Sequence, residues 1–398
     1  MGTINIKHTG SGADVSISSD GTSLLLNGTA VGGGALELYA ENPSTPTAPS
    51  ATGTNAVAVG NGSTASGDYA NSFGTGTAGG NYSTAVGTSA YSQGLSSFAA
   101  GSGAWSGANY STAIGRGFSG SATTATGSGA MALGGSYASG TDSFAAAIAN
   151  NTASYGATGL NSIAMGSLAK ATGNSSVAIG TSNTASGVGS ICIGSTGASI
   201  ASGTNSVAIG NQATASGSGS VVISSNGTGW GSDATAGSSF ALGDGAVSTI
   251  KGKFAFSSGS ATVSKGLMQA GMIVLTQVTS SISPNTLNSY NYSASGTNNQ
   301  VILPNNSAFA FHGVIVARQQ ASLGTGCAAW KIEGLIRREG SAGTTVLVNS
   351  ATTILDNTPA WGMILSADTT NGGLAITVIG AATNIRWVAT INTSEVTY

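Results

Sequence analysis

The amino-acid sequence predicts an all-β protein in which a parallel β-solenoid shaft lies between a small N-terminal β unit and a C-terminal β-sandwich or jelly roll. The first observation is a repeat that recurs every 13, 14 or 16 residues between about residues 55 and 245. The second is a composition with 63 Gly in 398 residues, 40% apolar but only 6% charged. The third is a series of short apolar segments after residue 251, separated by turn-forming residues. Since the apolar residues are placed periodically, we expect an ordered chain.

The repeat is clearest in the segment Asn205-Ser-Val-Ala-Ile-Gly-Asn-Gln-Ala-Thr-Ala-Ser-Gly217. In an extended strand its Val and Ile point to one face and the Ala between them to the other. Glycine suits corners that need positive φ or leave no room for a Cβ. So short a period predicts one solenoid coil per repeat, and some thirteen coils would form a rod on the order of 60 Å long. Clear copies occupy residues 55–67, 83–94, 161–173, 175–187 and 205–217.

A coil of this length has little interior, yet the repeat carries apolar residues on more than one face. Association with further copies of the chain would cover them, which favours a symmetric oligomer. The repeat Asn-Ser-Val-Ala-Ile-Gly, followed by Ala-Ser/Thr-Gly, resembles the head repeat of trimeric autotransporter adhesins, the YadA-like family. That resemblance covers about half of the chain. It implies a homotrimer of left-handed parallel β-rolls packed about a common axis.

Composition and pattern divide the chain into four parts. Residues 1–30 hold short alternating segments and a Ser-Asp-Gly turn, which predicts an N-terminal β attachment unit. Residues 31–54 are rich in Gly and Pro, a composition typical of a linker. Residues 55–250 hold the repeats. Residues 251–398 form a separate β-rich region, expected to be the tip domain.

The tip region contains at least six predicted strands, which favours a sandwich or jelly roll. Trp330 and Trp387 lie within two of these strands and are expected in the core. The strands are predicted at residues 299–304, 309–317, 329–336, 345–348, 373–379 and 385–391. The region resembles a C-terminal domain of tailed-phage fibres and other virion proteins, on the motifs Gly252-Lys-Phe-Ala-Phe-Ser-Ser-Gly259, Trp330-Lys-Ile-Glu-Gly-Leu-Ile-Arg337 and Ser366-Ala-Asp-Thr-Thr-Asn-Gly-Gly-Leu-Ala-Ile-Thr-Val. The resemblance implies a place in a virion.

Charge and cysteine placement argue against several kinds of partner. The eleven Lys and Arg are scattered apart from one Arg-Arg pair, so no nucleic-acid partner is expected. The first residues lack a stretch of signal-peptide length, and no segment reaches the ~18 apolar residues of a spanning helix, so no membrane insertion is expected. Cys192 takes an Ala position of the repeat and is predicted to be a small buried residue. Cys327 lies 135 positions away, so neither a disulfide nor a metal motif is expected. We expect no metal and no cofactor.

Catalytic residues are not expected either. A polysaccharide-cleaving spike needs two carboxylates a few ångströms apart. The repeats contribute Asp68, Asp142, Asp233 and Asp244, none at a repeat-related spacing from another. A Ser-His site is disfavoured because His312 lies within an apolar strand, where a structural role is expected. The sequence therefore predicts a protein that is not an enzyme.

Aromatic residues are the first candidates for recognition. Tyr91 and Trp105 each stand four residues after the first Gly of a repeat, where another repeat carries Lys170. We therefore expect both rings to face outward on neighbouring coils. Such a flat apolar platform can bind the sugar rings of a receptor, and aromatic stacking that stiffens the rod is the alternative. Phe98 and Phe144 replace the Val of the template and are predicted to lie in the core.

The tip region offers the other receptor-binding candidates. Tyr290 and Tyr292 lie in a predicted loop, and loops on rigid scaffolds often carry recognition. Arg337 and Arg338 end a predicted strand and are expected to point to solvent.

These patterns predict a non-enzymatic homotrimeric tail fibre of a bacteriophage. The N-terminus would attach to a tail or baseplate protein of the virion, and the tip would bind a host cell-surface glycan or protein with the avidity of three identical sites. A surface adhesin should carry an export signal, which is not visible here, so we expect the protein in the virion. The alternatives are a bacterial surface adhesin anchored by another chain, a capsid-mounted fibre and a polysaccharide-cleaving tailspike.

Overall fold

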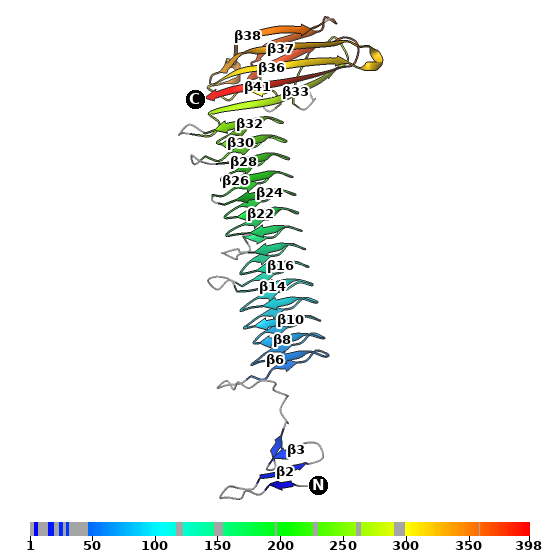
Figure 1. The fold of residues 1–398 in the computed structure, drawn as a ribbon, viewed down its shortest axis with the longest axis vertical. Helices are drawn as coiled ribbons and strands as arrows, with labels where there is room; N and C mark the ends of the chain where they lie inside the picture. The colour runs from blue at the N-terminus through cyan, green and yellow to red at the C-terminus, as the bar shows by residue number, and fades with distance from the viewer. Residues whose placement is uncertain are drawn as a thin grey trace.

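The computed structural model is a long rod of stacked coils with a wider β domain at its C-terminal end (Figure 1). It describes residues 47–116, 122–146, 154–195, 197–225, 230–259, 264–289, 299–357 and 359–398, together with the backbone of four strands before residue 32. Strands account for 50% and helices for 2% of the structure, so the predicted all-β class is confirmed. None of the helices in the described residues is long and apolar enough to span a membrane.

The first four strands form their own antiparallel sheet. These strands are β1 (Ile4–Ile6), β2 (Val15–Ser19), β3 (Leu24–Leu26) and β4 (Thr29–Val31), and they pair in sequence order. The alternating pattern predicts the first three. The fourth reaches the segment predicted to begin the linker, whose residues 32–46 lie outside the described part.

Every coil of the rod contributes one longer strand and one two-residue strand. The longer strands stack in parallel in one sheet, and the short strands stack in parallel in a second sheet of 14 strands. The rod therefore has about 14 coils, one more than estimated, and the strand spacing gives it a length of roughly 65 Å. The predicted parallel β-solenoid is confirmed.

The longer strands are β6 (Val57–Val59), β8 (Asn71–Gly74), β10 (Thr84–Gly87), β12 (Phe98–Ala100), β14 (Thr112–Ile114), β16 (Met131–Leu133), β18 (Phe144–Ala146), β20 (Ile163–Met165), β22 (Val177–Gly180), β24 (Ile191–Gly194), β26 (Val207–Gly210), β28 (Val221–Ser224), β30 (Phe240–Asp244) and β32 (Phe254–Ser258). The short strands are β5 (Ser50–Ala51), β7 (Thr64–Ala65), β9 (Thr77–Ala78), β11 (Tyr91–Ser92), β13 (Trp105–Ser106), β15 (Thr124–Ala125), β17 (Tyr137–Ala138), β19 (Gly156–Ala157), β21 (Lys170–Ala171), β23 (Thr184–Ala185), β25 (Ile200–Ala201), β27 (Thr214–Ala215), β29 (Asp233–Ala234) and β31 (Val247–Ser248). Because β5 precedes residue 55, the first coil begins inside the segment predicted to be linker.

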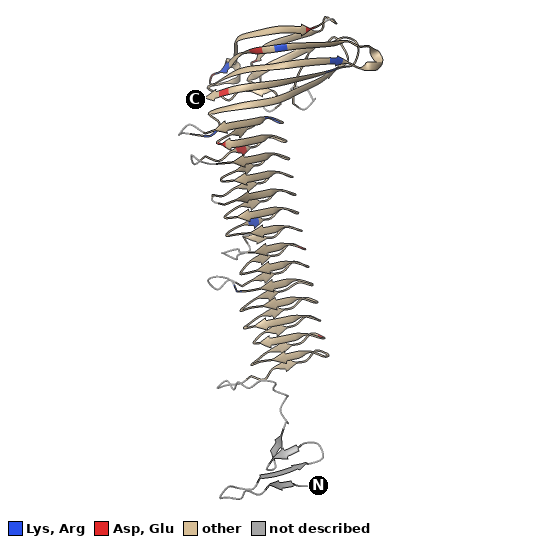
Figure 2. Cartoon of the chain, viewed as in Figure 1, with Lys and Arg blue, Asp and Glu red and all other residues tan. Residues whose placement is uncertain are grey.

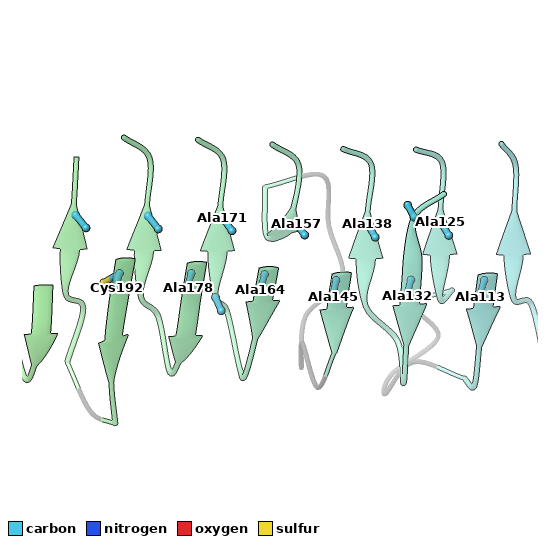
Figure 3. Close-up of a cluster of buried hydrophobic side chains, with 14 of the residues drawn as sticks. Ala113, Ala125, Ala132, Ala138, Ala145, Ala157, Ala164, Ala171, Ala178 and Cys192 are labelled. Carbon is cyan, nitrogen blue, oxygen red and sulfur yellow. The ribbon is translucent and has the colours of Figure 1, made fainter. Parts of the chain in front are cut away.

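The interior of the solenoid is lined mainly by alanine and serine. The alanines of the short strands and those of the longer strands form two rows along the rod (Figure 3), and most of them are 0% exposed. Cys192 and Val222 take the same inward position in their coils. The prediction for Cys192 is confirmed, and burial raises the pKa of its thiol to about 11. The interior thus accepts side chains only slightly larger than a methyl group.

The bulky apolar residues of the repeat lie on the outer face of the longer strands. In β26, Ala208 is fully buried while the following Ile209 is 36% exposed. Phe98 and Phe144 share the register position of Val207 and are half-buried on this outer face. The prediction that these two rings belong to the core is therefore wrong. A phenyl ring does not fit between two strands that face each other across an alanine-filled space.

The spacing of the coils depends on a glycine at the corner after most of the short strands. A Cβ on Gly173 would lie 2.2 Å from the carbonyl oxygen of Gly187 in the next coil. Glycine is required here because a neighbouring backbone lies where the Cβ would be. The same contact, at 2.1–2.2 Å, recurs at Gly67, Gly80, Gly127, Gly159 and Gly203.

The sheet of longer strands continues directly into the C-terminal domain. Its last parallel strand, β32, pairs antiparallel with β33 (Met268–Thr279). Four antiparallel strands then follow in the spatial order β41 (Ile385–Thr397), β36 (Ser307–Gln319), β37 (Cys327–Arg338) and β38 (Val346–Asp356). Shaft and tip are therefore joined by main-chain hydrogen bonds as well as by the covalent chain.

A second antiparallel sheet packs against this part of the first. Its strands are β34 (Asn285–Thr286), β35 (Val301–Ile302), β39 (Gly362–Asp368) and β40 (Gly373–Ile379), all paired through β40. Two short 3-10 helices, η2 (Ala321–Leu323) and η3 (Ala342–Thr344), lie in the connections. Both sheets contribute side chains to one hydrophobic core. The assignment of this domain as a sandwich or jelly roll stays a prediction.

Three tryptophans fill the centre of that core. Trp330 and Trp387 are each 2% exposed, which confirms their predicted burial, and their rings stack with centroids 5.8 Å apart. Trp361 lies 5.7 Å from the Trp387 ring at a tilted angle. The indole N–H of Trp387 donates to Oγ1 of Thr279 at 2.9 Å, so the buried polar atom is satisfied.

We predict that Gly173→Ala destabilises the shaft by about 3 kcal/mol, because the new methyl group forces two coils apart. Thermal unfolding followed by circular dichroism measures this. The matched control is Gly103→Asn in the same array. Gly103 has φ +69° and no atom within 4 Å of an added Cβ. Asn tolerates this conformation, so the control should change stability by less than about 0.5 kcal/mol. Equal effects of the two substitutions would contradict the close-approach argument.

Candidate functional site

Tyr91 and Trp105 lie side by side on the outer face of the short-strand sheet. They are Cα partners in the adjacent parallel strands β11 and β13, and each is 44% exposed. Lys170 extends from the same column of positions, with its Nζ 4.7 Å from the ring centroid of Tyr155. The expected outward orientation on neighbouring coils is confirmed. A role of the pair in receptor binding stays a prediction.

Sequence reasoning missed a second column of aromatic residues, at the corner that precedes each longer strand. Tyr69, Tyr82 and Tyr110 hold this position with φ values of 57°, 58° and 60°. They are 47%, 57% and 61% exposed. The rings of Tyr69 and Tyr82 stack in parallel, with centroids 5.1 Å apart and an interplanar angle of 3°. They occupy the position at which Asn205 opens the clearest repeat, which was a signal available in the sequence.

The tip candidates differ in their surroundings. Arg337 is exposed, as predicted, and forms an ion pair with Glu339. Arg338 points the other way: it is half-buried, and its Nη1 donates to the carbonyl oxygen of Leu303 at 2.7 Å. The prediction that Arg338 points to solvent is therefore wrong, because successive residues of a strand face opposite sides of the sheet.

Tyr290 and Tyr292 lie outside the described residues, so their proposed host contact stays a prediction. The two arginines line a shallow hollow of about 260 Å³ beside the C-terminal Tyr398. A second hollow, of about 410 Å³, lies over β33, β36 and β41 and is lined in part by Arg318 and Arg386.

Charged residues are concentrated in the C-terminal domain and at its junction with the shaft, while the rest of the shaft carries few (Figure 2). Asp68 is exposed at a coil corner, and His312 is exposed on the outer face of β36. Within the described ranges, no three His, Cys, Asp or Glu side chains are grouped closely enough to hold a metal ion. Both cysteines are free thiols, Cys192 buried and Cys327 exposed.

The densest ionic cluster lies where the shaft meets the tip. Lys253 in the last coil contacts both carboxylate oxygens of Glu395 in β41 at 2.6 Å, and their side chains are 7% and 3% exposed. Gln269 donates to the same carboxylate at 2.7 Å and Thr393 at 2.5 Å. A Cβ on Gly271 would lie 2.5 Å from Glu395 Oε1, so glycine leaves room for the pair. The arrangement is closed and fully paired, which suits a structural link between the two parts.

Segments of the solenoid match the family model of the YadA head domain repeat, in its two-copy form. The matched residues are 51–77, 78–104, 92–117, 157–183, 171–196 and 201–223. The repeats predicted from the sequence motif are therefore YadA-head repeats. No curated protein matches the chain. Together with the solenoid, the repeats fit an adhesin-like fibrous protein with a structural role.

We predict that Glu395→Gln loosens the tip domain from the shaft. It leaves the Lys253 charge buried without its partner, a loss of about 3–5 kcal/mol. The double variant Lys253→Met with Glu395→Leu removes both charges and should be destabilised far less. Hydrogen exchange of β32 and β33, compared among wild type and both variants, provides the measurement. If the double variant were as unstable as the single one, the pair would not be the link described here.

Proposed function

We propose that the protein is a non-enzymatic homotrimeric fibre of a phage virion that binds the host surface. The observation that carries the proposal is the apolar outer face of the longer strands, which extends along the whole rod. Two columns of side chains cover this face, on either side of the buried alanine. The first column is interrupted by Asn71, Thr84 and Thr112 in the N-terminal coils, and its apolar members are Val57, Phe98, Met131, Phe144, Ile163, Val177, Ile191, Val207, Val221, Phe240 and Phe254. The second holds Val59, Phe73, Val86, Ile114, Leu133, Met165, Ile179, Ile193, Ile209, Ile223, Leu242 and Phe256.

This face is far more apolar than the surface of a protein that functions as a single chain. The most open members of the two columns, such as Ile223 and Phe240, are 36–46% exposed. The face continues onto the tip domain through the exposed Met272, Val274 and Val278 of β33. Removing each of these side chains from water contributes roughly 1 kcal/mol or more of stabilising free energy. A single chain in water lacks this contribution along its whole length.

A second copy of the chain fits this face, because its side chains repeat at the same coil spacing along both copies. YadA head repeats are typically trimeric, which supports three copies about an axis along the rod. The remaining surfaces, including the short-strand face with Tyr91 and Trp105, would then point outward.

The place of the fibre in a virion is supported by the resemblance of residues 251–398 to C-terminal domains of tailed-phage fibres. In this proposal the N-terminal sheet attaches to a tail or baseplate protein, and the tip and shaft contact a host glycan or protein. The YadA-like repeats favour one second candidate, a bacterial surface adhesin. Electron microscopy with an antibody against the chain distinguishes the phage fibre from the adhesin. The antibody would bind phage particles in the first case, and bacterial cells but no particles in the second.

We expect wild-type protein to have three times the 38.2 kDa mass of one chain in multi-angle light scattering. Ile193→Asp combined with Ile209→Asp places charges on the apolar face and should give monomers. Thr184→Asp, on the short-strand face of the same region, is the control and should stay trimeric, because Asp233 occupies the same column naturally. A monomeric wild-type protein would refute the trimer.

We also expect Tyr91→Ala combined with Trp105→Ala to reduce adsorption to host cells roughly tenfold or more. Each lost ring contact contributes about 1 kcal/mol, and three chains act together. Ile200→Ala is the control, since Ile200 is 39% exposed in the same column but far from the aromatic pair. Adsorption is measured as the fraction of labelled fibre that binds to bacteria and is removed from solution with them. Unchanged adsorption of the double variant would exclude this platform as the receptor site.

A further inference from the structure

The corner column of aromatic residues contains a gap one coil high. Tyr82 and Tyr110 are separated by the coil whose corner residue is Ser96. The Ser96 N–H donates to the Asn81 carbonyl, and the Tyr110 N–H donates to the Leu95 carbonyl, both at 2.8 Å. These bonds place the three corners directly one above another. Two strand spacings, about 9.6 Å, therefore separate the levels of the two tyrosines.

The neighbouring pair Tyr69 and Tyr82 shows how rings lie in this column when consecutive corners both carry tyrosine. They stack in parallel with centroids 5.1 Å apart. At the next corner stands Ser96, so no aromatic side chain of this column lies between Tyr82 and Tyr110. A ring placed there would lie about 4.8 Å from each of Tyr82 and Tyr110, inside the 4.5–7 Å range of favourable ring stacking.

The left-handed backbone at these corners disfavours tyrosine, so we expect the ring to have a function there. Tyr82 and Tyr110 have φ values of 58° and 60°, in the left-handed region that residues other than Gly, Asn and Asp seldom adopt. Other coils carry smaller residues at this corner, such as Asn161, Asp142 and Ser175. Tyr82 stacks on Tyr69 on one side and is still 57% exposed, and Tyr110 is 61% exposed. Strained residues with exposed side chains are typical of binding sites.

The rim of the gap is polar and nearly uncharged. The side-chain oxygen of Asn81 accepts from the Asp68 N–H at 3.1 Å, and that of Asn109 accepts from the Leu95 N–H at 3.0 Å. Each fixed amide keeps its NH2 group for a ligand acceptor. Between residues 47 and 116 the charged residues are Asp68 and Arg116. Stacking faces with neutral hydrogen-bond donors at the rim suit a hydroxyl-bearing ring better than an ion or a fully apolar group.

We propose that the gap bounded by Tyr82, Ser96 and Tyr110 binds one neutral pyranose ring of a host-surface polysaccharide. The inference rests on the proposed function and assigns to it a ligand class and a second contact. This slot is separate from the Tyr91–Trp105 platform. The platform lies on the short-strand face of the two coils whose corner residues are Tyr82 and Ser96. A neutral chain that crosses the edge of the rod would contact both.

The first test is Tyr82→Asn combined with Tyr110→Asn. Binding of the purified full chain to an array of neutral hexose and N-acetylhexosamine oligosaccharides is measured, together with melting temperature and mass. We expect wild-type binding to at least one neutral oligosaccharide and at least a tenfold loss in the variant. The melting temperature should be unchanged or higher, because Asn suits the left-handed backbone. No binding by wild type, or equal binding by the variant, would overturn the slot.

The second test is Ser96→Tyr, which fills the gap with the protein's own ring. It should weaken oligosaccharide binding at least tenfold and leave the oligomeric state of the protein unchanged. Retained binding would overturn the proposal, and so would binding of N-acetyltyrosinamide in preference to every oligosaccharide. If the wild-type protein is a trimer that adsorbs to cells but binds no neutral oligosaccharide, the sugar slot is refuted and the proposed fibre function is not. A wild-type monomer that does not adsorb refutes the proposed fibre instead.

Discussion

The narrow interior of each coil is the constraint on which the rest of this structure depends. Two strands face each other across a space that alanine fills, so larger apolar side chains are directed outward. The same closeness requires glycine where one coil's corner meets the backbone of the next. A chain built this way stabilises itself mainly by its main-chain ladders and leaves its largest apolar side chains on the surface. The proposed assembly follows from that surplus of exposed apolar surface.

The junction with the tip domain covers the strand edge that the last coil of the solenoid would otherwise expose. Unpaired strand edges invite association with other chains. Here β32 pairs with the antiparallel strand β33, and the paired Lys253 and Glu395 replace the small residues that close the interior of other coils. One sheet therefore runs from the shaft into a domain of different topology, and the tryptophan core of that domain supports its far end.

The recognition proposed for the shaft depends on shape and ring stacking rather than on charge. Aromatic side chains occupy two of its surfaces near the same coils, the platform of Tyr91 and Trp105 and the corner of Tyr82 and Tyr110. A stack of parallel strands holds such rings at a fixed spacing that a loop does not provide. The proposed neutral ligand agrees with the shortage of charge along the rod.

The sequence by itself determined the all-β class, the coil period, the inward Ala and Cys192, the outward Tyr91 and most strands of the tip, because each of these depends on local periodicity. It did not predict β33, whose first residues Met, Gln, Ala and Gly have weak strand preference, or the pairing of Lys253 with Glu395 across 142 positions. The tertiary structure alone decided that Phe98 and Phe144 face outward and that Tyr82 stacks on Tyr69. Both depend on how much space the neighbouring coils leave, and periodicity along one strand carries no information about that distance.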